Sequence, residues 1–89
     1  MVGYLLSKRL RKLREEKGLL QKDIAKILNI TTSAYGYYEQ GERDPGTQVL
    51  EILADFYDVS IDYLMGRTDN RNESLPTDTE LEEFLQKAT

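Results

Sequence analysis

Apolar residues recur at helical spacing from the start of the chain. Leu6, Leu10 and Leu13 lie three or four residues apart, with mostly charged residues between them. This period is that of an amphipathic α-helix, which we predict over about residues 4–17. Gly18 follows, and glycine is the usual residue where a helix ends in a left-handed conformation. The chain is therefore predicted to open with one amphipathic helix.

Two shorter helices joined by a tight turn are predicted next. The first of them starts near Gln21, and its apolar side consists of Ile24, Ala25, Ile27 and Leu28. Residues 29–30 form the turn. The hydroxyl residues at 31–33 then favour a new helix start, because a hydroxyl at the N-cap accepts a hydrogen bond from a free backbone N–H. This helix is predicted to end near Gly41, before a turn-rich loop at 42–46.

Two further helices complete the predicted domain. Thr47 is expected to cap a fourth helix that is apolar on nearly all sides and therefore central to the core. Its apolar residues are Val49, Leu50, Ile52, Leu53, Phe56 and Tyr57. Ser60 is expected to cap a short fifth helix that Gly66 closes, with Ile61, Leu64 and Met65 as its apolar residues. No segment alternates with a period of two, so the predicted class is all-α, a compact five-helix bundle over residues 1–66.

The last quarter of the chain changes in character. Residues 67–77 are polar with one proline and predict a linker. Residues 78–89 are typical of an amphipathic helix, with Asp78 as its cap and Leu81, Phe84 and Leu85 on its apolar side. A helix this short is marginal alone in water, so that side must pack on something. The expected partners are a second copy of the chain, in a dimer contact, or the chain's own bundle.

Composition excludes several functions. The 89 residues are 39% hydrophobic and 31% charged, and they contain neither cysteine nor histidine. A zinc finger, a disulfide scaffold and catalysis by cysteine or histidine are therefore excluded. The glycines are scattered singly, without a phosphate-binding loop, so we expect no metal, cofactor, small-molecule ligand or enzymatic activity. With no apolar run of about 18 residues and no signal-peptide pattern, we expect no membrane contact and a cytoplasmic location.

Charge is divided unevenly along the chain. Residues 1–43 carry nine Lys and Arg against five Asp and Glu, whereas residues 44–89 carry three against eleven. The net charge of −4 therefore conceals a basic half, a distribution typical of a protein that meets DNA with one face. The alternative is that the basic residues of the first helix, Lys8, Arg9, Arg11 and Lys12, form only a solvated face.

The tight turn between the second and third predicted helices is typical of a helix-turn-helix DNA-binding unit. The residues around it resemble the phage repressor/Cro-type (XRE-like) helix-turn-helix family. The matching stretches are residues 21–25, 31–41, Pro45 and 59–66. The resemblance covers residues 4–66 nearly continuously, and it implies a transcription regulator whose third helix enters the major groove of DNA.

The resemblance also implies which residues touch DNA. Base contacts fall on Thr32, Ser33, Gly36 and Tyr37. This face lies opposite Tyr35 and Tyr38, so its residues are expected to stay outside when the apolar side packs. Phosphate contacts fall on Gln21, Lys22, Thr31 and Arg43. Leu20 departs from the family, which has a Ser, Thr or Asn there, and we expect the second helix to lose a side-chain cap worth about 1 kcal/mol.

Arg14 and Glu39 match a pair that, in the family, joins the first helix to the end of the third. A bidentate pair between an arginine and a carboxylate would hold the third helix in place. Its role is structural, and we expect loss of Arg14 to destabilise the fold.

One such domain reads only a few base pairs, so the resemblance favours a homodimer that acts as a repressor on a palindromic operator. The alternative function is that of a protein-binding module, such as an antitoxin or an adaptor. The negative net charge, the unusual Leu20 and the apolar tail all suit that alternative.

Overall fold

The structure is a computed structural model that describes residues 2–73, and every regular element in this range is a helix. The helices are α1 (Val2–Glu16), α2 (Gln21–Leu28), α3 (Thr32–Gln40), α4 (Thr47–Tyr57) and α5 (Ile61–Leu64). The predicted all-α class with five helices is confirmed. The predicted C-terminal helix, with Leu81, Phe84 and Leu85, lies outside the described residues.

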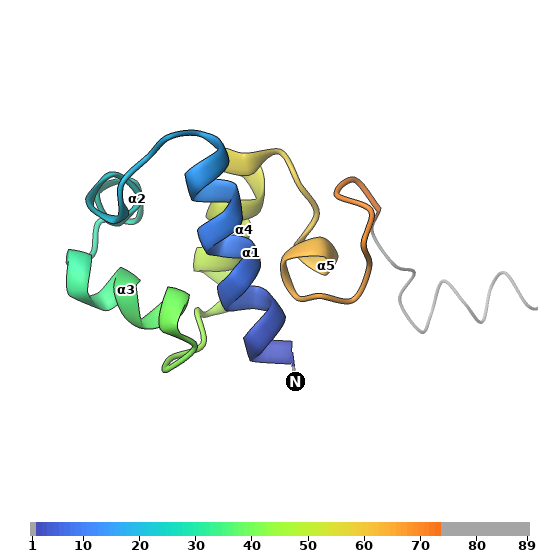
Figure 1. The fold of residues 1–89 in the computed structure, drawn as a ribbon, viewed down its shortest axis with the longest axis horizontal. Coiled ribbons are helices and arrows are strands. Elements are labelled where there is room, and N and C mark those ends of the chain that lie inside the picture. Colours follow the sequence, from blue (N-terminus) through green and yellow to red (C-terminus); the bar gives the residue numbers. More distant parts are fainter. Residues whose placement is uncertain (1, 74–89) are drawn as a thin grey trace, which may run out of the picture.

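The five helices are arranged along one long axis. Figure 1 shows α1 and α4 in the middle, α2 and α3 together at one end, and α5 with residues 67–73 at the other end. The α2–α3 pair is thus separated from α5 by the central helices. This arrangement leaves α3 at an end of the molecule, where its outer side is free of the other helices.

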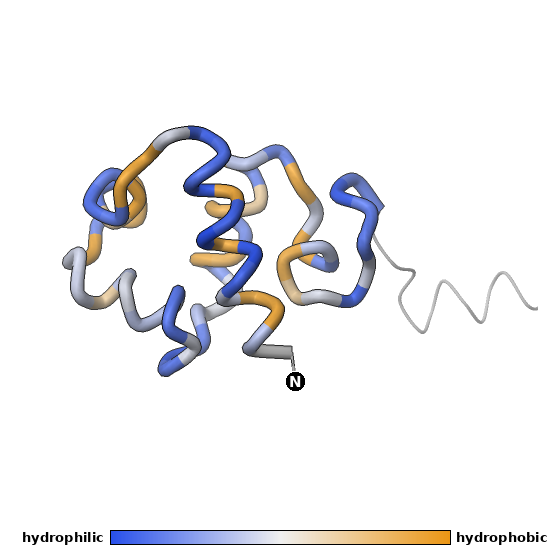
Figure 2. Tube along the Cα trace, viewed as in Figure 1, coloured by the Kyte–Doolittle hydropathy of each residue, from blue (hydrophilic) through white to orange (hydrophobic). Residues whose placement is uncertain are grey.

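The core forms where the apolar sides of all five helices meet. Its largest fully buried side chains are Tyr35, Leu10, Ile24, Leu53 and Leu64. Figure 2 shows hydrophobic residues recurring along α1 and α4, whereas α3 is mostly pale or hydrophilic. Burial of each large apolar side chain contributes about 1.5–3 kcal/mol, so this shared core is the main source of stability.

Hydroxyl side chains begin two of the helices. The Thr31 hydroxyl accepts a hydrogen bond from the Ala34 N–H at 3.0 Å, and the Ser60 hydroxyl accepts one from the Tyr63 N–H at 2.9 Å. The expectation that Thr47 caps α4 is wrong, because Gly46 occupies the N-cap position and Thr47 is the first helical residue. Gly46 has no side chain, so α4 begins without a side-chain cap.

The start of α2 is only partly uncapped. Leu20 is the N-cap residue, and its side chain makes no capping hydrogen bond, as the sequence predicts. Asp23, however, reaches back and accepts a hydrogen bond from the Leu20 N–H at 2.8 Å. One half of a capping box is therefore present and offsets part of the expected loss.

Some predicted core positions face outward. Ile27 is 42% exposed, although it was predicted on the apolar side of α2. On α4, Ile52 and Phe56 are also exposed, so this helix is not surrounded by core. The physical reason is that each helix packs through one side only, which for α4 consists of Leu50, Leu53, Ala54 and Tyr57.

Residues 67–73, which the composition assigns to a linker, pack on α1 and α5. The Ser60 N–H donates to the Arg71 carbonyl at 2.7 Å, and the Ser60 hydroxyl donates to the Glu73 carbonyl at 2.7 Å. Arg71 also forms an ion pair with Glu16, at the end of α1, at 2.6 Å. This part of the predicted linker is thus hydrogen-bonded to the bundle.

Arg9 holds this segment in place. Its side chain is only 13% exposed, so the expectation of a fully solvated basic face on α1 is wrong at this position. The guanidinium donates to the carbonyls of Tyr63 and Thr68 and to the carboxylate of Asp69, and it lies 4.2 Å from the centroid of the Tyr63 ring. Arg9 therefore joins α1 to α5 and to the start of the C-terminal segment.

The Arg9 contacts predict a measurable loss of stability. Arg9→Ala leaves two partly buried carbonyls without their charged donor, and we expect the free energy of unfolding to fall by about 1.5–3 kcal/mol. Lys12→Ala, at an exposed position of the same helix, is the control and should change it by less than about 0.5 kcal/mol. Urea unfolding followed by circular dichroism measures both. Equal stabilities of the two variants would contradict the assignment.

Candidate nucleic-acid interface

The inner side of α3 anchors this helix in the core. Tyr35 is completely buried, and its ring meets that of Tyr38 edge to face at a centroid distance of 6.3 Å. Thr31 begins the helix, and Gly41 ends it with a φ of 75°. Because both ends and the inner side are set by these contacts, the outer side of α3 has a defined position.

The outer side of α3 carries uncharged polar groups around a shallow hollow. This α3 hollow has a volume of about 280 Å³, and it is lined by Gln21, Thr32, Ser33, Gly36, Tyr37 and Gln40. Thr32, Ser33 and Tyr37 are exposed, in the way that the sequence predicts for groups that touch bases. Gln40 was not among the predicted residues, although its spacing of four and eight from Gly36 and Thr32 places it on the same side.

Gly36 does not lie on the surface, so the expectation that it stays outside is wrong. It is buried, and a Cβ atom at this position would lie 3.6 Å from the amide oxygen of Gln21. The Gln21 side chain, which comes from α2, therefore extends over Gly36. The glycine forms the floor of the α3 hollow and not one of its projecting edges.

A buried ion pair fixes the end of α3 to α1. The Arg14 Nε lies 2.7 Å from one carboxylate oxygen of Glu39, and Nη2 lies 2.9 Å from the other. Their side chains are 12% and 3% exposed. Arg14 also donates to the Leu19 carbonyl at 2.9 Å, in the connection to α2. One guanidinium thus joins α1, the α1–α2 loop and α3.

Glu39 also receives a hydrogen bond from α2. The amide nitrogen of Gln21 lies 3.2 Å from the carboxylate oxygen Oε1. Burial alone would raise the pKa of Glu39, but the hydrogen bonds from Arg14 and Gln21 contribute to a net pKa below its ordinary value of 4.5. Glu39 is therefore ionised at neutral pH.

Two tyrosine hydroxyls lie buried in the same region. Both hydroxyls, of Tyr35 and of Tyr57, are shielded from solvent, and the charge of Glu39 acts on each of them. Burial and the nearby charge of Glu39 raise the pKa of Tyr57 to about 12, and burial also raises the pKa of Tyr35. Both phenols stay neutral, so the buried charges of Arg14 and Glu39 balance one another here.

Two of the predicted phosphate contacts lie at the α3 hollow, because Gln21 lines it and Arg43 lies against Tyr37, which also lines it. The Arg43 guanidinium lies 4.7 Å from the centroid of the Tyr37 ring, which brings a positive charge beside α3. Lys22 and Thr31 are exposed, and the Thr31 hydroxyl keeps its own hydrogen for donation while it accepts from Ala34. The first turn of α2 adds backbone N–H groups that have no partner within the helix.

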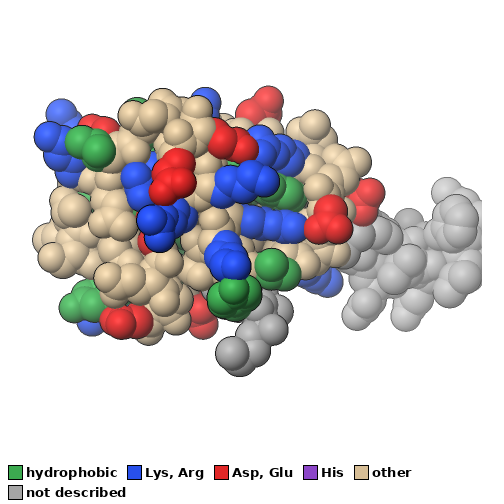
Figure 3. Space-filling model, viewed as in Figure 1, with side chains coloured by type: hydrophobic (Ala, Val, Ile, Leu, Met, Phe, Trp, Pro, Cys, Tyr) green, Lys and Arg blue, Asp and Glu red, His purple; other side chains and the backbone are tan. Residues whose placement is uncertain are grey.

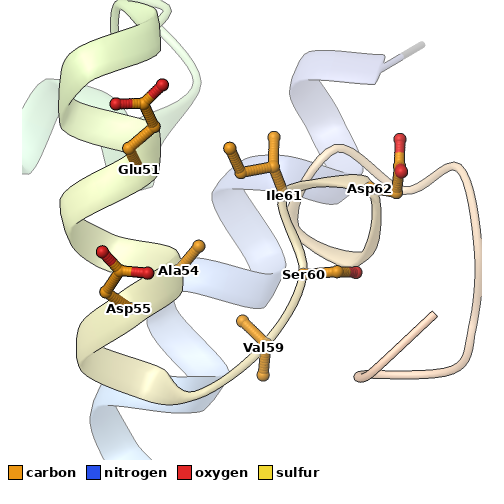
Figure 4. Close-up of a pocket in the computed structure, with 7 residues that line it drawn as sticks. All are labelled: Glu51, Ala54, Asp55, Val59, Ser60, Ile61 and Asp62. Atoms are coloured by element: carbon orange, nitrogen blue, oxygen red, sulfur yellow. The ribbon is translucent and has the colours of Figure 1, made fainter. Parts of the chain in front are cut away.

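A second hollow lies at the other end of the molecule. It measures about 640 Å³ between α4 and α5, and it is lined by Glu51, Ala54, Asp55, Val59, Ser60, Ile61 and Asp62. Figure 4 shows Glu51 and Asp55 on α4 and Asp62 on α5. Asp62 lies 3.5 Å from the Arg67 guanidinium, which leaves Glu51 and Asp55 as the charges of this lining. Such an acidic lining repels phosphate, so this larger hollow does not suit DNA.

Basic side chains gather elsewhere. Figure 3 shows Lys and Arg side chains gathered over α1 on the face drawn there, with Asp and Glu side chains among them. Within residues 2–73, no group of three or more carboxylates is arranged so that it could hold a metal ion. No helix in this range is both long and apolar enough to cross a lipid bilayer.

An exposed α3 that follows α2 after a tight turn defines this molecule as a helix-turn-helix protein. The family model described as "Helix-turn-helix" matches residues 10–64. The uncharacterised HTH-type transcriptional regulator YobD of Bacillus subtilis is 40% identical over 89% of this chain and 70% of its own length. The chain therefore belongs to the helix-turn-helix family of transcriptional regulators.

Two further relatives are a bacterial regulator and a phage repressor. The HTH-type transcriptional regulator ImmR of Bacillus subtilis is 37% identical over 92% of this chain and 66% of its own length. The transcriptional repressor RstR of the cryptic phage CTXphi, from Vibrio cholerae, is 31% identical over 93% of this chain and 76% of its own. These relatives are transcriptional regulators, the class of protein that the sequence predicts.

A solved structure has the same fold. The crystal structure of a transcriptional regulator from Listeria innocua superposes with a TM-score of 0.69 and 31% identity, over 93% of this chain and 74% of that one. The solved structure therefore supports the helix-turn-helix fold that the family model indicates.

The buried ion pair predicts a large effect from one substitution. Arg14→Ala leaves the Glu39 carboxylate buried and unpaired, and we expect the free energy of unfolding to fall by about 3–5 kcal/mol. The control is Arg11→Ala, because Arg11 pairs with Glu15 at a similar 2.9 Å on the exposed side of α1. That exposed pair should contribute only about 0.3–0.5 kcal/mol. Thermal melts that shift equally for both variants would argue against the role given to Arg14.

The low pKa of Glu39 predicts a pH dependence with a definite sign. The folded state holds the proton of Glu39 less tightly than the unfolded state, whose pKa is near 4.5. The stabilisation is therefore complete above pH 4.5 and is lost as the pH falls below this value. Carbon-13 NMR titration of the Glu39 carboxyl group should give a pKa below 4.5, and urea unfolding should show the parallel loss. A titration midpoint above 4.5 would refute the ionised pair.

Proposed function

We propose that this chain is a transcriptional repressor that binds a specific operator sequence in double-stranded DNA, with α3 in the major groove. The observation that carries this proposal is the exposed, uncharged outer side of α3, held in one orientation by the buried pair of Arg14 and Glu39. An α-helix fits the major groove, where each base pair presents a distinct pattern of donors and acceptors. A rigid helix with free polar groups suits such reading.

The base contacts are assigned to Thr32, Ser33 and Tyr37, with Gly36 beneath them in the α3 hollow. Hydroxyl groups both donate and accept, and the Thr methyl group can meet the methyl group of thymine. The phosphate contacts are assigned to Gln21, Lys22, Thr31 and Arg43. Gln21 and Arg43 support this assignment, because Gln21 lines the α3 hollow and Arg43 brings positive charge beside Tyr37. Positive charge and free N–H groups at a helix start favour the DNA backbone.

The repressor is proposed to act as a homodimer on a palindromic operator. One α3 contacts only a few base pairs, and two copies would read half-sites about 34 Å apart. The candidate dimer residues Leu81, Phe84 and Leu85 lie outside the described part of the chain. We place the protein in the cytoplasm, because its proposed partner is DNA and its relatives are bacterial or phage regulators. No ligand, metal or membrane is part of this proposal.

A second candidate function is that of a protein-binding module, such as an antitoxin or an adaptor. Two apolar side chains of the α2 region favour it, since Leu20 is 57% exposed and Ile27 is 42% exposed. Salt separates the two candidates. Binding to phosphates weakens steeply as the salt concentration rises, whereas an apolar protein contact changes little.

The proposed function predicts the outcome of selection from a random pool of DNA duplexes. The wild-type protein should enrich an inverted repeat, because two copies of α3 would read equivalent half-sites. The triple variant Thr32→Ala, Ser33→Ala, Tyr37→Ala should lose this enrichment, while its circular dichroism spectrum stays helical. Sequencing of the bound duplexes measures both results.

The control is Lys22→Ala, which removes a proposed phosphate contact from the same face. It should enrich the same inverted repeat, with lower affinity and a salt dependence that is shallower by about one ion. A folded, dimeric wild-type protein that enriches no sequence would favour the protein-binding module.

A further inference from the structure

The Glu39 carboxylate sets the orientation of the Gln21 side-chain amide. Arg14 donates to both carboxylate oxygens of Glu39, which fixes the position of the carboxylate. Because this carboxylate is ionised, it has no hydrogen to donate. Only the NH₂ end of the Gln21 amide can therefore face it, and Nε2 lies 3.2 Å from Oε1 of Glu39. A reversed amide would place two acceptors against each other. The ion pair thus dictates which end of Gln21 points away.

The outward end of this amide lies in the α3 hollow. A Cβ atom on Gly36 would be 3.6 Å from the Gln21 oxygen Oε1, so this oxygen extends over the glycine that forms the floor of the hollow. The other lining residues, Thr32, Ser33, Tyr37 and Gln40, bring neutral polar groups. The hollow therefore presents a fixed hydrogen-bond acceptor in neutral surroundings.

A fixed acceptor discriminates between the groups that DNA offers. Phosphate oxygens are themselves acceptors and gain no hydrogen bond from Oε1. The donors in the major groove are the exocyclic amino groups, N6 of adenine and N4 of cytosine. We infer that the Gln21 side chain is a specificity-determining residue, whose amide oxygen accepts a hydrogen bond from the amino group of an adenine or a cytosine in the α3 hollow.

This inference rests on the proposed function and revises one of its contacts. The phosphate contact at Gln21 then falls to the donors of this residue. These are the second hydrogen of the amide nitrogen, since only one faces Glu39, and the backbone N–H at the start of α2, which has no partner within the helix. The side chain belongs to the base-reading surface together with Thr32 and Ser33. Glu39, which does not touch DNA, acts as a positioning residue for this reading.

The test uses the selected operator with single base analogues. Each adenine of a half-site is replaced in turn by purine, which lacks the N6 amino group, and each cytosine by 2-pyrimidinone, which lacks the N4 amino group. One of these replacements should weaken wild-type binding about 5- to 10-fold, the effect of one lost hydrogen bond. If the sensitive base is an adenine, 7-deazaadenine is the control at that position. It retains the N6 amino group, so the protein should bind this duplex as tightly as the natural one.

The matching variant is Gln21→Met, which keeps the length of the side chain but has no amide oxygen. It should bind the natural operator about 5- to 10-fold less tightly and suffer no further loss with the sensitive analogue. Gln21→Ala is the second variant and should behave in the same way. Gln21 is half-buried at the first position of α2, so both variants are expected to fold, which circular dichroism checks.

Lys22→Met is the control for a phosphate contact. It should weaken binding to the natural and the analogue duplexes by the same factor. The inference is overturned if Gln21→Met also weakens binding to the natural and the analogue duplexes by one common factor, so that each analogue still weakens binding as it does for the wild-type protein. This result applies only when the wild-type protein selects an operator. A wild-type protein that selects no sequence overturns the proposed function and this inference together.

Discussion

The buried ion pair between Arg14 and Glu39 is the interaction on which the arrangement of this domain depends. It lies where α1, the α1–α2 loop and α3 meet, and both of its side chains are almost out of solvent. A charge in such a place is stable only while its partner is present. The pair therefore also fixes the position of α3, because the charges of Arg14 and Glu39 are paired only when α3 lies against α1. Through Glu39 it also sets the direction of the Gln21 amide.

Charge is separated along the long axis of the molecule. The α3 hollow at one end has neutral polar walls with Arg43 beside Tyr37, whereas the hollow between α4 and α5 carries three carboxylates. A negative net charge is therefore compatible with DNA binding, because phosphates respond to the local potential of the face that they approach. The acidic end would also disfavour approach to DNA in the wrong orientation.

Local pattern predicted most of the fold and failed at particular residues. Helical spacing and cap residues place all five helices, with ends within a few residues, because these signals act within one turn of the chain. Ile27, Ile52 and Phe56 were expected in the core and are exposed, since the pattern does not say which side of a helix finds a partner. Arg9 was assigned to a solvated face, but carbonyls more than fifty residues away bury it.

The sequence by itself determined the class of the protein, its helices and the residues that border α3. Hydrophobic spacing, turn residues and the family motif are local properties of the sequence, so they can be recognised without the structure. Only the tertiary structure decided that Gly36 is the floor of a hollow, that Gln40 lines it and that the Gln21 oxygen points into it. These properties arise because side chains of α1 and α2 both contact Glu39 on α3. Their relative placement is set by packing and by one buried pair between residues 25 positions apart, which no local pattern records.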